Sequence, residues 1–451
     1  MIRLFKNPGH RLIRRYTSAI LLLFSLVSAY VPAMATTSSK PDNLSRKLPA
    51  LINRGGYIVT RDGLTISSKA PDTAFIPAST IKVATSLAAL RILGDDYRFK
   101  TQFFSDSNGT LYIKGFGDPY LVSEEVALIL DQLQAHGVTV INDIVIDDSA
   151  FLLPEEAPSW SDNTLNPYDA ANNALAVNFN TMGIRVSSKG QVVSAEAQTP
   201  TLPLMRELGV TLSSGNQRIN ISKSTEHIYR YTAELFRALQ KQKGITGHGM
   251  LRKATVPEKL TPVYTHLSSK PLNEVIRCML AVSSNFIANQ LFLTLGAKRF
   301  GYPATWEKGQ MALREFYMEG LKLTDSVLYM EEGSGLSRRT HITPRAMLTI
   351  LEAFKPYADL LRCYGDARLK TGTLTGAYAY AGFFSRGGSF DPFVILLNQQ
   401  RNTRRQVLAL LQEIYNAPSK ETVALVIAPD RQALTQKSKT ASSKNRRLAK
   451  Q

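Results

Sequence analysis

The chain has 451 residues, 44% of them hydrophobic, a formal net charge of +18 and only two cysteines. This length is too great for one compact core, so we expect two domains. Five positive charges lie in residues 1–35 and seven in residues 431–451, which leaves a body of +6. Such a mildly basic body argues against a nucleic-acid-binding protein. The cysteine count excludes a disulfide scaffold, and we expect Cys278 and Cys363 to be buried free thiols, although export would permit a disulfide.

The N-terminus has the features of a secretory signal peptide. A basic start is followed by the apolar run 20–31, and Ala33-Met34-Ala35 is a small-x-small cleavage signature. We predict residues 1–35 to be a signal peptide that is cleaved after Ala35. The alternative is an uncleaved membrane anchor, which the shortness of the apolar run disfavours. No later stretch is apolar enough to cross a bilayer.

The C-terminal segment 429–451 is predicted to be a basic disordered tail. From residue 431 onward it has seven cations, no acidic residue and too little apolar content to fold. Two roles remain open for it: solubility, or electrostatic contact with anionic envelope polymers or a membrane surface.

The remaining pattern alternates between helical and strand-like segments. Strands are expected within 55–76, with a turn at 61–63, and again on both sides of Asn108-Gly109, a strong hairpin signal. Helical spacing is found at 79–93, 123–136, 228–243, 271–322, 344–354 and 404–415. Further strands are expected at 138–147, in pieces up to residue 221, and at 367–375, 378–385 and 392–398.

This order predicts an α/β domain made from both ends of the chain, 36–96 and 256–428. We expect the segment between them, 97–255, to be an inserted strand-rich domain.

The stretch "PASTIKVATSLAAL" places Ser79 and Lys82 three residues apart at the start of a predicted helix. Residues i and i+3 share a helix face, so the two side chains can come within hydrogen-bond distance. A serine hydroxyl needs a base to become a nucleophile, and a buried lysine with a lowered pKa can be that base. Alone, this short pattern is weak evidence.

Two further motifs follow in the expected order. "MLAVSSNFIANQLF" contains Ser283-Ser284-Asn285, and "ARLKTGTLTG" contains Lys370-Thr371-Gly372-Thr373. The sequence S-x-x-K, then S-D-N, then K-T-G is the signature of penicillin-binding proteins and class A β-lactamases. In this chain Ser284 takes the place of the aspartate.

With these motifs, the chain resembles a low-molecular-mass class C penicillin-binding protein of the D-alanyl-D-alanine carboxypeptidase/endopeptidase family. Three further stretches add to the resemblance: "YIKGFGDPYL", "NPYDAANNALAVNFN" and "EEGSGLSRRTHITP", in which Glu332 replaces the family's aspartate. The resemblance implies a serine β-lactamase-like α/β domain with an antiparallel sheet flanked by helices. It also implies a periplasmic hydrolase of peptidoglycan stem peptides that β-lactam antibiotics inhibit covalently, with no metal or cofactor.

The resemblance assigns four catalytic residues. Ser79 would be acylated by the penultimate D-alanine, and Lys82 would be its general base. Ser283 would pass a proton to the leaving amine, together with Lys82 or Lys370. Asn285 would hold the substrate's backbone amide and steady Lys82.

Four further residues are implied to bind the substrate. Lys370 and the hydroxyls of Thr371 and Thr373 would bind the carboxylate beside the scissile bond. Gly372 would leave room for the substrate against the strand. The backbone N–H groups of Ser79 and Thr373 would form the oxyanion hole.

Other functions fit the sequence less well. A Ser-His-Asp hydrolase could use Ser334 in "EGSGL", but none of the five histidines after the signal segment has a convincing partner. A β-lactamase would be much shorter, and no His/Cys/Asp cluster has the spacing of a metal site. The alternative from a different class is a non-catalytic cell-wall-binding or penicillin-sensing protein on the same fold, which the complete S-x-x-K and K-T-G motifs argue against.

Overall fold

A computed structural model describes residues 47–154 and 164–417. The predicted signal peptide and the predicted basic tail lie outside these residues. Within them, every helix is too short or too polar to cross a lipid bilayer.

The main sheet joins the two ends of the chain. Its six strands lie in the order β13-β14-β15-β16-β1-β2, and each neighbouring pair is antiparallel. The bounds are β1 Gly55–Arg61, β2 Leu64–Lys69, β13 Arg362–Tyr364, β14 Ala367–Leu374, β15 Ala377–Arg386 and β16 Ser389–Leu397. Because β1 pairs with β16, for example Ile58 with Val394, the N-terminal and C-terminal segments form one unit.

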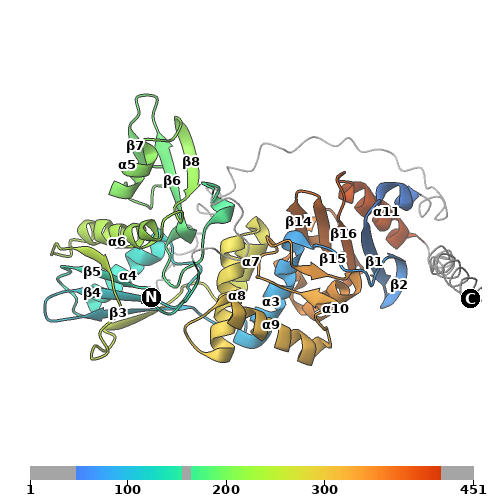
Figure 1. The fold of residues 1–451 in the computed structure, drawn as a ribbon, viewed down its shortest axis with the longest axis horizontal. Helices are drawn as coiled ribbons and strands as arrows, with labels where there is room; N and C mark the ends of the chain where they lie inside the picture. Colours follow the sequence, from blue (N-terminus) through green and yellow to red (C-terminus); the bar gives the residue numbers. More distant parts are fainter. Residues whose placement is uncertain (1–46, 155–163, 418–451) are drawn as a thin grey trace, which may run out of the picture. The chain divides into compact units, whose positions relative to one another are not determined.

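Helices cover both faces of this sheet (Figure 1). On one face, α11 (Arg404–Asn416) and the helical residues 47–51 pack against buried side chains of the sheet such as Tyr57 and Phe393. The opposite face carries the larger core, which includes Ile58 and Phe383. The helices of this core are α3 Lys82–Leu93, α7 Leu272–Val282, α8 Asn285–Phe300, α9 Trp306–Leu321 and α10 Pro344–Phe354.

Helix α3 is central to that core because every residue from Lys82 to Leu90 is buried. A helix that is buried on all sides should be apolar all round. Lys82, Thr85 and Ser86 are the polar exceptions, and each has a hydrogen-bond partner. The small hairpin formed by β11 (Leu328–Tyr329) and β12 (His341–Ile342) flanks the segment that contacts Lys82.

The segment between the two parts of the main sheet contains two further sheets. The five-stranded sheet has the order β10-β3-β4-β5-β9, and the three-stranded sheet has the order β7-β6-β8. Their bounds are β3 Lys100–Ser105, β4 Leu111–Gly115, β5 Ile144–Asp147, β6 Thr181–Val186, β7 Val192–Ser194, β8 Gly215–Asn220, β9 Leu251–Lys253 and β10 Tyr264–Leu267. Helices α4 Ser123–Ala135, α5 Pro203–Gly209 and α6 Thr225–Gln242 pack in a core of their own with these strands. Since β10 pairs with β3, we propose that the insertion extends to Leu267 and not only to residue 255.

Several local predictions are wrong. The α-helix expected from Ser79 begins only at Lys82, because residues Ala78–Ile81 form a 3₁₀ turn. The strand expected at 138–147 is regular only from Ile144. Helix α5 lies in a stretch where only strands were expected.

The prediction of two buried thiols is also wrong in part. Both cysteines are free, but Cys363 is exposed and Cys278 is half-buried. Cys363 lies on β13, the edge strand of the main sheet, which no further strand of the described residues covers.

Candidate active site

The 3₁₀ turn at Ala78–Ile81 brings Ser79 and Lys82 together. A 3₁₀ helix has three residues per turn, so side chains at i and i+3 are aligned. The Lys82 Nζ lies 3.0 Å from the Ser79 Oγ. Strand β14 lies directly against this turn: a Cβ on Gly372 would be 2.6 Å from the Pro77 carbonyl oxygen, so only glycine fits there.

The Lys82 amine is completely buried and surrounded by three oxygens. Besides the Ser79 Oγ, it contacts the Asn285 Oδ1 at 2.8 Å and the Ser334 carbonyl oxygen at 2.7 Å. Burial lowers the pKa of Lys82 well below its ordinary value, and the nearby charge of Lys370 lowers it further, while Glu332 acts in the opposite direction. A neutral amine has two N–H groups and one lone pair. The amide and peptide oxygens can accept the two N–H groups, which leaves the lone pair for the serine hydroxyl.

The Ser283-Ser284-Asn285 motif is a tight turn between α7 and α8. Ser283 ends α7 in a left-handed conformation with φ 58°, and Asn285 is the first residue of α8. The Ser284 Oγ caps α8 by accepting from the Ile287 N–H at 3.2 Å. Serine and aspartate are both good N-cap residues, which explains why Ser284 can replace the usual aspartate here.

This turn directs its two outer side chains to the two lysines. The Ser283 Oγ accepts from the Lys370 Nζ at 2.8 Å. Asn285 contacts Lys82 through its Oδ1 and donates from its Nδ2 to the Tyr168 carbonyl oxygen at 3.1 Å. Asn285 therefore joins Lys82 to the segment 164–170, which lies between the two parts of the main sheet in the sequence.

Lys370 is 2% exposed on β14 and also donates to the Thr371 carbonyl oxygen at 2.9 Å. Its pKa is lowered to about 7 by burial, and then by the positive charges of Arg404 and Arg362. The charged groups that face it come from three elements: Arg404 from α11, Arg362 from β13 and Lys82 from α3. These surroundings therefore favour the neutral form of Lys370, and a nearby anion would favour its cation.

One edge of β14 is open beside these groups. Strand β13 pairs only with Ala367–Leu369, so the following residues of β14 have no partner strand on that side within the described chain. Thr371 and Thr373 lie there with exposed side chains. An extended peptide can add to such an edge through its backbone.

The structure thus brings together six of the predicted site residues: Ser79, Lys82, Ser283, Asn285, Lys370 and Gly372. Thr371 and Thr373 are neighbours of Lys370 and Gly372 on β14, and strand alternation places their side chains on the other face of the sheet. Three other contributors were missed. They are the Ser334 carbonyl, the Glu332 carboxylate and the Arg404 side chain.

Glu332 and Ser334 form the loop that closes the Lys82 pocket. The fully buried Glu332 carboxylate accepts from the backbone N–H groups of Ser334 and Gly335, both at 2.7 Å, and of Ser337 at 3.3 Å. The loop thereby presents the Ser334 carbonyl to Lys82. The "EEGSGLSRR" stretch indicated that this segment belongs to the site, but the sequence did not show that the Ser334 carbonyl contacts Lys82.

The loop also decides against the Ser-His-Asp alternative. The Ser334 Oγ accepts from the Leu336 N–H at 3.2 Å, and no histidine of the described residues bonds to it. Among all described residues, there is no cluster of three or more His, Cys, Asp or Glu side chains that could hold a metal ion.

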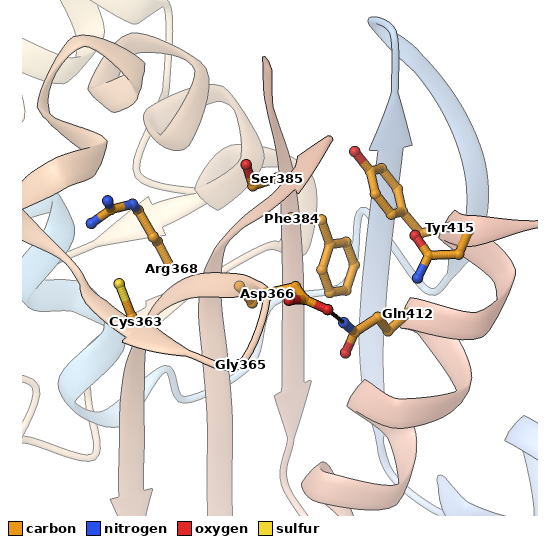
Figure 2. A pocket seen from close by; sticks show the side chains of 10 residues that line it. Cys363, Gly365, Asp366, Arg368, Phe384, Ser385, Gln412 and Tyr415 are labelled. Atoms are coloured by element: carbon orange, nitrogen blue, oxygen red, sulfur yellow. Dashed lines mark hydrogen bonds between the residues drawn. The ribbon is translucent and has the colours of Figure 1, made fainter. Parts of the chain in front are cut away.

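A cavity of about 320 Å³ lies elsewhere on the main sheet (Figure 2). It is lined by residues such as Asp366, Phe384 and Tyr415, and the Asp366 Oδ2 accepts from the Gln412 Nε2 at 3.4 Å. None of the predicted site residues lines it. We therefore place the candidate active site at Ser79, whose hydroxyl contacts the buried Lys82 amine, and not at this cavity.

The chain is similar to known carboxypeptidases and penicillin-binding proteins. A sequence model of the D-Ala-D-Ala carboxypeptidase 3 (S13) family matches residues 42–362. The chain is 26% identical to the D-alanyl-D-alanine carboxypeptidase DacB of Haemophilus influenzae, over 86% of this chain and 95% of that protein. It is 24% identical to a D-alanyl-D-alanine carboxypeptidase of Actinomadura sp., over 76% of this chain and 69% of that protein. A crystal structure of penicillin-binding protein 4 (dacB) from Haemophilus influenzae superposes with a TM-score of 0.68 at 22% identity, covering 83% of this chain and 100% of that chain.

The chain therefore belongs to the D-Ala-D-Ala carboxypeptidase 3 (S13) family. It is a serine-type carboxypeptidase of the hydrolase class, and the predicted penicillin-binding α/β fold is confirmed. The family match includes the Ser79 and Ser283 motifs, whereas the Lys370 strand follows its end at residue 362.

Proposed function

We propose that the protein hydrolyses the terminal D-alanyl-D-alanine bond of peptidoglycan stem peptides through an acyl-enzyme on Ser79. One observation carries this proposal: the buried Lys82 amine contacts the Ser79 Oγ at 3.0 Å while two carbonyl oxygens occupy its other directions. Burial and a like charge favour the neutral amine. Lys82 is thus suited to the role of general base.

The reaction takes place in two halves. Lys82 accepts the proton of the Ser79 hydroxyl as the oxygen attacks the penultimate D-alanine carbonyl. The backbone N–H groups of Ser79 and Thr373 stabilise the oxyanion. The C–N bond then breaks, and Ser283 passes a proton to the leaving amine and is reprotonated from Lys82 or Lys370. In the second half, the neutral Lys82 amine takes a proton from the water that attacks the ester. Lys82 then returns this proton to the Ser79 oxygen as the C–O bond breaks, which releases the shortened peptide and restores the serine hydroxyl.

The carboxylate of the leaving D-alanine binds between Lys370, Thr371 and Thr373. Lys370 is nearly buried and close to other cations, so a carboxylate there gains a charge-assisted hydrogen bond. Gly372 lets the substrate strand lie close to β14, and Asn285 holds the substrate's backbone amide. These roles explain why the open edge of β14 lies beside the nucleophile.

The same site supports three wider proposals. A direct cross-link to diaminopimelate also carries a carboxylate next to the scissile nitrogen, so we include endopeptidase activity. β-Lactams are acyl donors with a carboxylate in the corresponding position, and a related structure from Haemophilus influenzae (TM-score 0.62) is complexed with a β-lactam. We also propose export to the periplasm, on the signature around Ala35, and electrostatic contact of the basic tail with envelope polymers or a membrane surface.

The test compares D-alanine release from a soluble pentapeptide by the wild type, Ser79→Ala and a control, Ser326→Ala. Ser326 is exposed, and among the described residues its hydroxyl hydrogen-bonds only to Thr324. We expect no release by Ser79→Ala and normal release by the control. D-alanine release by Ser79→Ala at more than a small fraction of the wild-type rate would show that another residue is the nucleophile.

A further inference from the structure

Arg404 reaches into the substrate-binding strand from outside all three motifs. It is the first residue of α11, and its Nη1 donates to the Thr373 Oγ1 at 2.7 Å and to the Gly372 carbonyl oxygen. The Nη1 carries two hydrogens, and these two contacts use both. Arg404 thus bonds two consecutive residues of the predicted carboxylate-binding segment.

An aromatic ring fixes the position of the guanidinium. Its Cζ lies 4.8 Å from the centre of the Tyr380 ring, which is a cation–π distance. Tyr380 is directly opposite Thr371 in the β14–β15 ladder, so the ring and the two threonines share one face of the sheet. The Arg404 Nε is buried without a hydrogen-bond partner in the described chain. The two hydrogen bonds of Nη1 and the contact with the Tyr380 ring thus hold the side chain in place, although its Nε–H has no acceptor there.

The direction of the Arg404–Thr373 bond has a chemical consequence. An arginine can only donate, so the Thr373 oxygen must accept, and its own proton has to point elsewhere. The side chain of Thr373 is exposed at the open edge of β14. Its O–H is then free to donate to an anion at that edge.

We propose that Arg404 is a positioning residue: it orients the Thr373 hydroxyl as a donor to the substrate carboxylate and so sets the preference for peptides with a free C-terminal carboxylate. This proposal rests on the proposed function, in which that carboxylate binds beside Lys370. Arg404 acts through Thr373 and is not itself assigned a contact with the substrate.

The experiment uses two forms of one soluble pentapeptide, which end in D-alanyl-D-alanine and in its C-terminal amide. The proteins are the wild type, Arg404→Gln, Arg404→Lys, Thr373→Val and the double variant Arg404→Gln/Thr373→Val. Arg401→Gln is the matched control, because Arg401 is an exposed cation just before α11 whose side chain has no hydrogen bond or ion pair with the described residues. Circular dichroism checks that each variant is folded.

We expect Arg404→Gln to lower kcat/KM for the acid by about tenfold, mainly through KM, and to change the amide little. Arg404→Lys should recover part of the loss, and Arg401→Gln should behave as the wild type. Since Arg404 acts through Thr373, the double variant should be no worse than Thr373→Val alone. An equal loss on acid and amide, or losses that multiply in the double variant, would overturn the proposal.

A second readout separates this proposal from the proposed function. The acylation rate of each variant is measured with a penicillin that has a free carboxylate and with its methyl ester. If the wild type acylates but does not cleave the peptide, the proposed substrate is wrong, and the acid-to-ester ratio still tests Arg404. An unchanged ratio in Arg404→Gln contradicts the role of Arg404.

Discussion

Replacing the buried Glu332 by glutamine tests the loop that presents Ser334 to Lys82. The carboxylate accepts three backbone N–H groups, two on its Oε1 and one on its Oε2. Glutamine keeps one accepting oxygen and turns the other position into a donor. We expect the amide oxygen to stay with Gly335 and Ser337, so that the amide NH₂ faces the Ser334 N–H and that bond is lost.

The structure sets the size of this effect. A hydrogen bond to a charged group contributes about 1.5–3 kcal/mol, and a buried N–H without an acceptor costs about 1–3 kcal/mol. Removing a fully buried charge offsets part of the sum, since the carboxylate no longer has to be desolvated. We predict that Glu332→Gln lowers the free energy of unfolding by about 2–4 kcal/mol. Activity should fall as well, because the Ser334 carbonyl helps to orient Lys82.

Urea unfolding measures the first effect, with the midpoint lowered and the slope unchanged. The matched control is Glu413→Gln, which removes a carboxylate from the exposed face of α11. Its free energy of unfolding should stay within about 0.5 kcal/mol of the wild type. If Glu332→Gln has the same urea midpoint as this control, the three N–H contacts do not stabilise the loop as argued.

Three further predictions concern the carboxylate clamp and the tail. Lys370→Ala should slow the cleavage of a soluble pentapeptide and of cross-linked muropeptide dimers by about one to two orders of magnitude each, since one charge-assisted hydrogen bond is lost. Lys370→Arg should keep part of both activities, and the loss of one activity alone would contradict a shared clamp. Because the pKa of Lys370 is about 7 and the clamp needs its cation, kcat/KM should fall as the pH rises through that value, and a profile that is flat up to pH ~9 would contradict this. Removing residues 431–451 should leave peptide turnover unchanged and weaken binding to cell-wall sacculi at low salt, where charges are screened least; equal binding by both forms would refute the role of the tail.

The motifs predicted which residues the structure brings together because each motif has a local geometric reason. Ser79 and Lys82 are three residues apart, which a 3₁₀ turn aligns as well as an α-helix does. Lys370 and Gly372 alternate with threonines on a strand, so two residues lie on the face of the larger core and two on the opposite face. These relative positions of side chains depend on a few consecutive residues, so a sequence motif can predict them.

The contacts that sequence could not give are those between distant segments. Arg404 meets Thr373 across 31 residues, and the Ser334 carbonyl meets Lys82 across 252. No periodicity or motif marks either pair. Our proposal that the insertion extends to Leu267 depends on the same kind of contact, since β10 is a four-residue strand that pairs with the distant β3.

The most direct test of the central claim is to find where a penicillin binds covalently. The purified protein is incubated with a penicillin, its intact mass is measured, and the modified residue is identified by peptide mapping. We predict one adduct of one penicillin mass on the peptide that contains Ser79, and none in Ser79→Ala. An adduct on Ser334 or on any residue other than Ser79, or no adduct in the wild type, would contradict the assignment of Ser79 as the nucleophile.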